Sequence, residues 1–160
     1  MKIGFGYDVH RLVRHRKLFL GGVQIPFHLG LEGHSDADVL IHAIVDAVLG
    51  ALGLGDIGRH FPDTDPVWKG ADSTCFLQAV RDLLEKHAHR LVNLDATVLA
   101  TEHKLLPYAA SITSSIAKHL RVDASLVNVK AKTTEGLGFI GEQKAMAAYA
   151  VVSIEKIPAA

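Results

Sequence analysis

The sequence predicts an α+β fold in which a mixed β-sheet carries helices on one of its faces, with a small hairpin near the N-terminus. Segments in which apolar residues recur at helical spacing alternate with strand-like segments, which favours a mixed sheet. A Gly21-Gly22 pair between two short apolar runs is typical of a hairpin. The chain has 160 residues, 49% of them apolar and 21% charged, which suits a single domain over 1–160 with its own core.

The first half of the chain combines strands, one helix and a long loop. We expect a strand over 2–12, a hairpin over 17–26, a loop over 27–36, a helix over about 37–53 and a second loop over 53–72. Ser35 or Asp36 is suited to cap the helix, which ends in glycine-containing sequence. The second loop holds four glycines and two prolines and lacks periodicity. Loops of this length in a small domain are usually functional or mobile.

The second half of the chain alternates helix and strand. Phe76, Val80 and Leu84 recur at helical spacing, and Pro107 suits the first turn of a later helix. We expect a helix over 73–88, a strand over 90–100, a helix over 107–120, a strand over 126–134, a glycine-bearing turn over 135–141 and a last strand over 145–157. Together with the first strand, these elements supply the predicted sheet and the helices that cover it.

Charge and cysteine content exclude several classes of function. Lys plus Arg and Asp plus Glu both number 17, so no basic excess favours binding to nucleic acid or to an anionic membrane. Cys75 is the only cysteine, which excludes an intrachain disulfide and a CxxC zinc site. The start of the sequence lacks the pattern of a secretory signal, so we expect a cytoplasmic protein. The apolar run over 39–55 is short for a membrane span and favours a buried helix.

Two segments carry metal-ligating side chains that the predicted elements place on common faces. Asp8 and His10 are two residues apart in the first predicted strand and face the same side. Asp38, His42 and Asp46 follow at four-residue steps on one stripe of an apolar helix, where burial without a partner would be costly. Asp8, His10 and His42 therefore predict a zinc site with a free fourth position, and we expect Asp46 to orient a ligand imidazole. By spacing alone, a surface Asp–His hydrogen bond and an ordinary helix histidine remain alternatives.

Six motifs stand in order along the chain and together resemble one enzyme family. They are GYDVH at 6–10, GGVQIP at 21–26, GHSDADVLIHAIVDAVLGALGLGDIGRHFPDTDP at 33–66, KGADS at 69–73, HKLLPY at 103–108 and NVKAKTTEGLGF at 128–139. Over essentially its whole length, the chain resembles the 2-C-methyl-D-erythritol 2,4-cyclodiphosphate synthases of the non-mevalonate isoprenoid pathway. The resemblance implies a two-layer sandwich with a mixed four-stranded sheet and helices on one face. It also implies a homotrimer with active sites between subunits.

The same resemblance implies a metal-dependent phosphorus–oxygen lyase reaction. In this family the 2-phosphate of 4-diphosphocytidyl-2-C-methyl-D-erythritol 2-phosphate attacks the β-phosphorus of the same molecule. CMP leaves, and 2-C-methyl-D-erythritol 2,4-cyclodiphosphate forms. The nucleophile is already an anion, so positioning and charge neutralisation carry most of the catalysis.

The resemblance implies two cations and two catalytic residues. The three residues of the predicted zinc site match the zinc ligands of the family. Glu135 matches a glutamate that binds Mg²⁺ or Mn²⁺ between the α- and β-phosphates. His34 and Thr133 match the positions credited with stabilising the transition state.

The implied substrate contacts fall into two groups. On the zinc and methylerythritol side they are Asp8, Val9, His10, His34, Ser35, Asp56, Ile57, Gly58, Phe61, Pro62, Asp63, Thr64 and Asp65, the last five belonging to the mobile loop. On the cytidine and diphosphate side they are Ala100, Thr101, Glu102, His103, Lys104, Leu105, Leu106, Ala131, Lys132, Thr133, Thr134, Glu135 and Phe139. In the family, these two sides of one active site come from neighbouring subunits.

The sequence departs from the family pattern at three positions. Glu142 lies in a GEQKA run where many members have arginine, and that arginine helps to bind an anionic isoprenoid diphosphate in a cavity on the trimer axis. The reversed charge would repel such an anion, so we expect this ligand to be absent or weakly bound. Phe5 often stands as histidine in relatives, and Gly136 often as lysine. These changes leave the predicted zinc ligands intact.

Two other functions are compatible with parts of the pattern. A zinc-dependent phosphoester hydrolase would use a metal-bound hydroxide on a related substrate. A trimeric module that binds cytidine nucleotides without turnover would need the fold and the nucleotide pocket only. The presence of both predicted cation sites argues against the second alternative.

Overall fold

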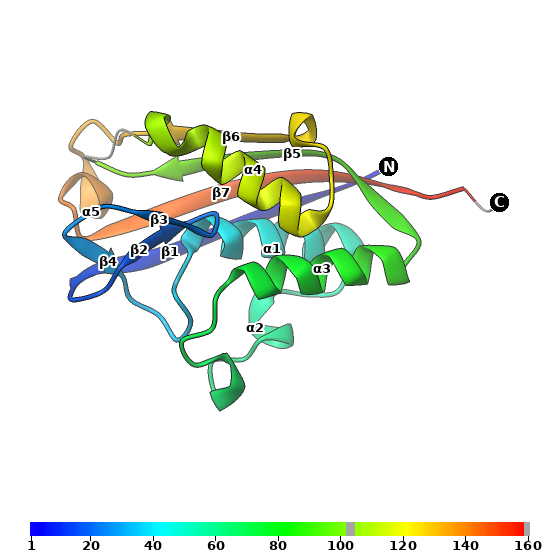
Figure 1. The fold of residues 1–160 in the computed structure, drawn as a ribbon, viewed down its shortest axis with the longest axis horizontal. Helices are drawn as coiled ribbons and strands as arrows, with labels where there is room; N and C mark the ends of the chain where they lie inside the picture. The colour runs from blue at the N-terminus through cyan, green and yellow to red at the C-terminus, as the bar shows by residue number, and fades with distance from the viewer. Residues whose placement is uncertain (102–104, 159–160) are drawn as a thin grey trace.

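The computed structural model of the chain describes residues 1–101 and 105–158, and it consists of two layers (Figure 1). One layer is a mixed sheet in the order β4-β1-β7-β5-β6. Its strands are β1 (Lys2–Arg14), β4 (Leu29–Leu31), β5 (His89–Leu99), β6 (Val127–Lys132) and β7 (Ala145–Lys156). Only β5 and β6 run parallel, and the other pairs are antiparallel. The predicted mixed sheet with four long strands is confirmed, and the short β4 extends it at one edge.

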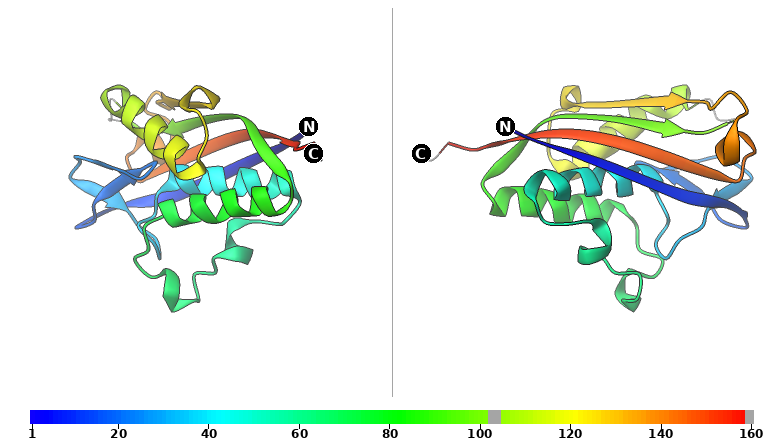
Figure 2. Two further views of the ribbon diagram at one scale, coloured as in Figure 1. Left: turned by 45° about the vertical axis from the view of Figure 1, so that its right-hand side comes forward. Right: turned by 180° about the vertical axis from the view of Figure 1, so that it is seen from behind.

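Helices form the second layer and cover one face of the sheet, as the two views of Figure 2 make clear. They are α1 (Val39–Leu52), α3 (Thr74–Lys86) and α4 (Ala109–Leu120), with the single turns α2 (Ile57–His60) and α5 (Gly138–Gly141). The predicted hairpin forms a separate two-stranded sheet of β2 (Leu18–Leu20) and β3 (Val23–Ile25). Within the described residues, no helix is long and apolar enough to cross a membrane.

Three segments are more regular than the sequence predicts. Residues 29–31 form β4 inside the expected loop over 27–36, because the far end of β1 offers them a pairing edge. The expected loop over 53–72 contains α2 and a 3₁₀ turn over 66–68, each capped by an aspartate whose carboxylate accepts a backbone N–H. The turn over 135–141 contains α5. These elements are too short for periodicity to reveal them.

Strand β1 lies directly on helix α1, and glycines make this approach possible. A Cβ atom on Gly4 would be 1.8 Å from the carbonyl oxygen of Ala47, and one on Gly6 would be 2.0 Å from that of Ala43. Nearly every residue of α1 is buried between the sheet and the other helices. The close approach brings the side chains that follow Gly6 on the same face of β1 against the first turns of α1.

The Gly6→Ala variant is expected to lose about 3 kcal/mol of unfolding free energy, the upper end for an overpacked core. The added methyl group would force β1 away from α1, because the atoms it meets belong to the helix backbone. Gly50→Ala is the matched control. A Cβ on exposed Gly50 meets nothing nearer than 3.9 Å, so this change should stabilise α1 by about 0.5–1 kcal/mol. Urea denaturation measures the unfolding free energy of both variants. If the Gly6→Ala protein had the same denaturation midpoint as the unmodified chain, the expected clash between β1 and α1 would be contradicted.

Candidate metal centre

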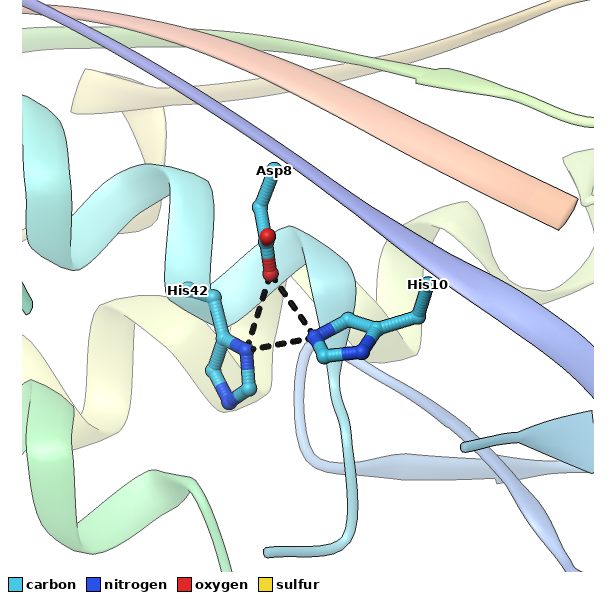
Figure 3. A group of neighbouring side chains, drawn as sticks. All are labelled: Asp8, His10 and His42. Atoms are coloured by element: carbon cyan, nitrogen blue, oxygen red, sulfur yellow. Dashed lines mark hydrogen bonds and ion pairs between the residues drawn. The ribbon is translucent and has the colours of Figure 1, made fainter. Parts of the chain in front are cut away.

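Asp8 and His10 from β1 and His42 from the first turn of α1 point toward one another (Figure 3). The Asp8 Oδ2 atom lies 2.9 Å from His10 Nε2 and 2.9 Å from His42 Nδ1. The two ring nitrogens are 3.0 Å apart. Strand alternation turns Asp8 and His10 to the helix side, and the Gly6 contact holds them at the depth of His42. The structure thus brings three of the four predicted metal ligands to one point.

Hydrogen bonds at the outer ring nitrogens orient the two imidazoles. His10 Nδ1 lies 2.7 Å from the carbonyl oxygen of Glu32, which can only accept, so this nitrogen carries the proton. His10 Nε2 is then free to present its lone pair to the centre. His42 Nε2 faces the hydroxyl groups of Ser73 and Ser35 at 3.1 and 3.3 Å, which leaves Nδ1 on the inner side.

This arrangement fits a divalent cation such as zinc. A carboxylate oxygen and two imidazole nitrogens are zinc ligands, and around a tetrahedral ion such atoms lie about 3.3 Å apart. The observed separations need to open by only a few tenths of an ångström. Lone pairs from all three groups facing one point would repel one another unless a proton or a cation lies between them. The three side chains are 11–28% exposed, so a fourth position remains accessible from solvent.

The pKa values of Asp8 and His10 shift toward their charged forms. Burial is the largest influence on the Asp8 carboxyl and opposes its ionisation, but hydrogen bonds and charges from His10 and His42 outweigh it and lower the pKa. Burial likewise disfavours the His10 imidazolium, but the hydrogen bond and charge of Asp8, helped by the Glu32 carbonyl, raise its pKa. The Asp8 carboxylate therefore stays ionised, and His10 holds a proton beside it more readily than a free imidazole does when no cation is bound.

Zinc affinity is expected to fall as the pH is lowered through the raised pKa of His10. A zinc ion and a proton compete for His10 Nε2, so binding zinc below this pKa must release the proton. The apparent affinity should fall by about tenfold for each pH unit below that pKa, and the decline should begin above pH 6.5, the ordinary imidazole value. Competition with a chromophoric chelator between pH 5 and pH 8 measures the slope. A decline that begins only well below pH 6.5 would contradict the raised pKa.

A cavity of about 420 Å³ opens beside the three ligands. Most of the residues predicted for the methylerythritol side line it, namely Asp8, His10, His34, Ser35, Ile57, Gly58, Phe61, Pro62 and Asp63, together with His42. Trp68 and Phe76 also line it, although no sequence motif predicted a site role for either. Trp68 lies in a segment without periodicity, and Phe76 fits equally well as an ordinary core residue of α3. The sequence pattern therefore could not identify either residue as part of a site.

The predicted mobile loop lies packed against this cavity. Phe61 contacts Trp68 and Phe76, with ring centroids 5.2 and 4.5 Å away. His34 Nε2 donates to the backbone carbonyl of Asp65 at 3.2 Å, and the His34 carbonyl accepts from the backbone N–H of Gly70 at 2.7 Å. His34 therefore joins the loop to the segment that precedes α1. Thr64 is exposed and Asp65 is half-buried, and neither lines this cavity.

Asp46 and Asp56 hold the short helix α2, which supplies Ile57 and Gly58 to the cavity. The Asp46 carboxylate accepts the backbone N–H of Ile57 at 2.7 Å, and the Asp56 carboxylate accepts that of Arg59 at 3.0 Å. The prediction that Asp46 orients a ligand imidazole is therefore wrong. Both ring nitrogens of His42 are occupied by Asp8, His10 and the serines, whereas Asp46 lies one turn further along α1 and reaches α2.

Six of the residues predicted for the cytidine side line a second cavity, of about 310 Å³. Its lining includes Ala100, Leu105, Leu106, Ala131, Lys132 and Thr133. Glu102, His103 and Lys104, predicted for the same pocket, lie outside the described residues. Among the residues that the structure describes, the two cavities share no lining residue. One chain therefore carries two separate parts of the predicted site.

The remaining predicted residues lie near the turn that follows β6. Glu135 is exposed and accepts the Thr133 hydroxyl at 2.6 Å. The Thr134 hydroxyl donates to the Leu137 carbonyl at 2.8 Å, and that of Thr101 donates to the Ile140 carbonyl. Val9 and Phe139 line a recess on the outer side of the sheet instead of either cavity. The predicted second cation ligand is thus on a different part of the chain surface from the three-residue metal centre.

Comparisons with known proteins give a consistent result. A sequence model described as the YgbB family matches residues 1–155. A relative from Geobacter sulfurreducens, named 2-C-methyl-D-erythritol 2,4-cyclodiphosphate synthase, is 58% identical over 156 residues, which cover 98% of this chain and 99% of the relative.

Solved structures agree with this match. The bifunctional IspDF from Campylobacter jejuni superposes with a TM-score of 0.94 at 44% identity over 98% of this chain, which spans 42% of the length of that bifunctional protein. A CDP complex of IspF from Plasmodium falciparum gives a TM-score of 0.86 at 37% identity, covering 98% of this chain and 97% of that one.

Proposed function

This chain belongs to the YgbB family of 2-C-methyl-D-erythritol 2,4-cyclodiphosphate synthases, and on this premise we propose that Asp8, His10 and His42 hold a catalytic zinc ion. The chain converts 4-diphosphocytidyl-2-C-methyl-D-erythritol 2-phosphate to the 2,4-cyclodiphosphate and CMP. It is a metal-dependent lyase of non-mevalonate isoprenoid biosynthesis. The convergence of three ligand atoms within about 3 Å of one another is the observation that supports the metal assignment.

The reaction needs positioning more than it needs a base. A bond forms between an oxygen of the substrate's 2-phosphate and its β-phosphorus, and the bond from that phosphorus to the bridging oxygen of CMP breaks. Asp8, His10 and His42 would hold a divalent cation, and its positive charge would offset the repulsion between the two phosphates. His34 lies in the same cavity, and its Nε2–H can exchange the Asp65 carbonyl for a phosphate oxygen. Ile57, Gly58 and Phe61 bind and shield the methylerythritol part.

A second cation, Mg²⁺ or Mn²⁺, is assigned to Glu135, and the cytidine to the second cavity. The Thr133 hydroxyl lies 2.6 Å from the Glu135 carboxylate, so both groups can contact the same diphosphate. Thr133 also lines the second cavity with Ala131 and Lys132, which supports a diphosphate position at the edge of that cavity. The CDP complex of the Plasmodium falciparum relative supports a nucleotide-linked substrate.

We assign the chain to a homotrimer in which the two cavities come from neighbouring copies. The face of the sheet opposite the helices carries exposed apolar side chains, among them Ile3 and Phe5 at 70% and 62% exposure, with Tyr149 and Val151 beside them on β7. Such a contiguous apolar patch is typical of a buried interface. We propose that in such a trimer the Glu135 turn of one copy lies next to the metal centre of another.

The products of the reaction test this function against the two alternatives. Purified protein with zinc and magnesium is incubated with the CDP-linked substrate, and phosphorus NMR follows the products. A cyclic diphosphate together with CMP is expected. A linear phosphate or inorganic phosphate would indicate the zinc-dependent hydrolase instead, and binding of CDP without any product would indicate the non-catalytic cytidine nucleotide module.

Geranyl diphosphate is expected to bind this chain only weakly. The Glu142 carboxylate lies 2.5 Å from Lys144 Nζ and neutralises that cation beside the recess of the outer sheet face. A Glu142→Arg variant restores the positive charge and should bind geranyl diphosphate at least about tenfold more tightly. Isothermal titration measures both affinities. Equal affinities in the two proteins would contradict an effect of the reversed charge.

A further inference from the structure

We propose that Ser73, with Asp36 behind it, is a positioning residue that sets the tautomer of His42 and so turns its Nδ1 lone pair toward the metal centre. The inference rests on the proposed metal site, in which His42 is a ligand. It adds two residues from outside the predicted ligand set. They lie in the loops that precede α1 and α3, far apart in the sequence.

The contacts of Asp36 determine where the hydroxyl proton of Ser73 points. Asp36 Oδ1 lies 2.5 Å from Ser73 Oγ, and Asp36 Oδ2 accepts the backbone N–H of Ser73 at 3.0 Å. A carboxylate can only accept, and a hydroxyl group has one proton to donate. The Ser73 proton therefore lies on the bond to Asp36. A short bond to a charged acceptor is among the stronger hydrogen bonds in proteins, so this direction is well defined.

The direction of that bond fixes the role of His42. With its proton committed to Asp36, Ser73 Oγ has only lone pairs left for His42 Nε2 at 3.1 Å. His42 must then donate from Nε2, and the neutral ring has its lone pair on Nδ1. That atom lies 2.9 Å from Asp8 Oδ2 and 3.0 Å from His10 Nε2, at the metal centre. The opposite tautomer would place a proton where the cation binds.

The contacts of Ser35 are compatible with this direction of the network. Its Oγ accepts the backbone N–H of Ala37 at 3.1 Å and lies 3.3 Å from both Ser73 Oγ and His42 Nε2. The Ser35 proton can go to the second lone pair of Ser73 Oγ, after which every donor in the group has an acceptor. Ser73 is fully buried, so water cannot take the place of its hydroxyl group.

The Ser73→Ala variant tests the proposal on protein supplied with zinc, which occupies the site that a proton would otherwise take beside Asp8. Its backbone N–H still reaches Asp36, and the Ser73 side chain makes no capping bond to α3, so the fold should be retained. Long-range ¹H–¹⁵N NMR of the histidines reads which ring nitrogen of His42 carries the proton. The unmodified chain should show His42 protonated on Nε2, and the variant should show a mixture of both tautomers. Zinc affinity in the variant, measured by chelator competition, should fall about 10–100-fold.

Two further variants make the test decisive. Asp36→Asn removes the charged acceptor and should change the tautomer and the zinc affinity in the same direction, even if Ser73→Ala fails to fold. Ser114→Ala, on the exposed side of α4, is the control and should change neither. An unmodified chain with His42 protonated on Nδ1 would overturn the proposal, as would an unchanged tautomer in a folded variant. The expected tautomer in a chain that fails to bind zinc would refute the metal site and leave the positioning of His42 standing.

Discussion

Replacing His42 with alanine is expected to abolish turnover while leaving the chain folded. The change removes one of three ligands, and two ligands hold a divalent cation poorly. Loss of the cation removes several kcal/mol of transition-state stabilisation, so the rate of cyclodiphosphate formation should fall by about 10³-fold or more. Alanine is the best helix former, so α1 should persist. Phosphorus NMR measures the rate, and circular dichroism and bound zinc are measured on the same sample.

His119→Ala is the matched control for this variant. His119 is also a helix histidine, but it lies on α4 and contacts Gln78 instead of the metal centre. The His119→Ala protein should retain its bound zinc and its normal rate of cyclodiphosphate formation. A folded His42→Ala protein with a near-normal rate would show that His42 is not a ligand of the catalytic ion.

Replacing Glu135 with glutamine is expected to lower turnover by about 10²-fold without loss of zinc. The amide keeps the shape of the side chain but loses the charge that a second cation requires. Because Glu135 is exposed and its described side-chain contact is the Thr133 hydroxyl, the change should cost little stability. The rate is measured over a magnesium titration, where the variant should need a much higher concentration for half-maximal activity.

Zinc content separates the two metal variants from each other. His42→Ala should lose zinc, whereas Glu135→Gln should retain it and respond only to magnesium or manganese. Glu155→Gln is the control for the second variant. Glu155 lies near the C-terminal end of β7, where it pairs with the exposed Arg90 of β5. An unchanged magnesium dependence in the Glu135→Gln protein would show that Glu135 is not a ligand of the second cation.

Most of the fold follows from local pattern. Helical spacing in the two long amphipathic segments, strand alternation over 2–12 and the Gly21-Gly22 turn each predict an element that the structure contains. The short elements β4, α2 and α5 escaped prediction because three or four residues carry no period. β4 in particular forms because the edge of β1 that faces away from β7 is free to pair.

Spacing predicts the common orientation of Asp8, His10 and His42, but it does not predict the surroundings of this candidate metal centre. Asp8 and His10 share a strand face, and His42 lies in an apolar helix, so local rules place all three on buried surfaces. Ser73 and Asp36 reach His42 through contacts across the fold, and no interval in the sequence encodes such contacts. Asp46 shares a helical stripe with His42, yet it bonds α2, because a stripe does not specify which neighbour a side chain meets.

A crystal structure of the zinc-loaded protein, with anomalous data collected at the zinc absorption edge, would locate the ion and so test the assignment of its ligands. We expect an anomalous peak at about 2.0–2.2 Å from each of Asp8 Oδ2, His10 Nε2 and His42 Nδ1. We also expect a fourth position open to the cavity that His34 and Phe61 line. Zinc bound by other residues, with the side chains of Asp8, His10 and His42 turned away from one another, would contradict this assignment.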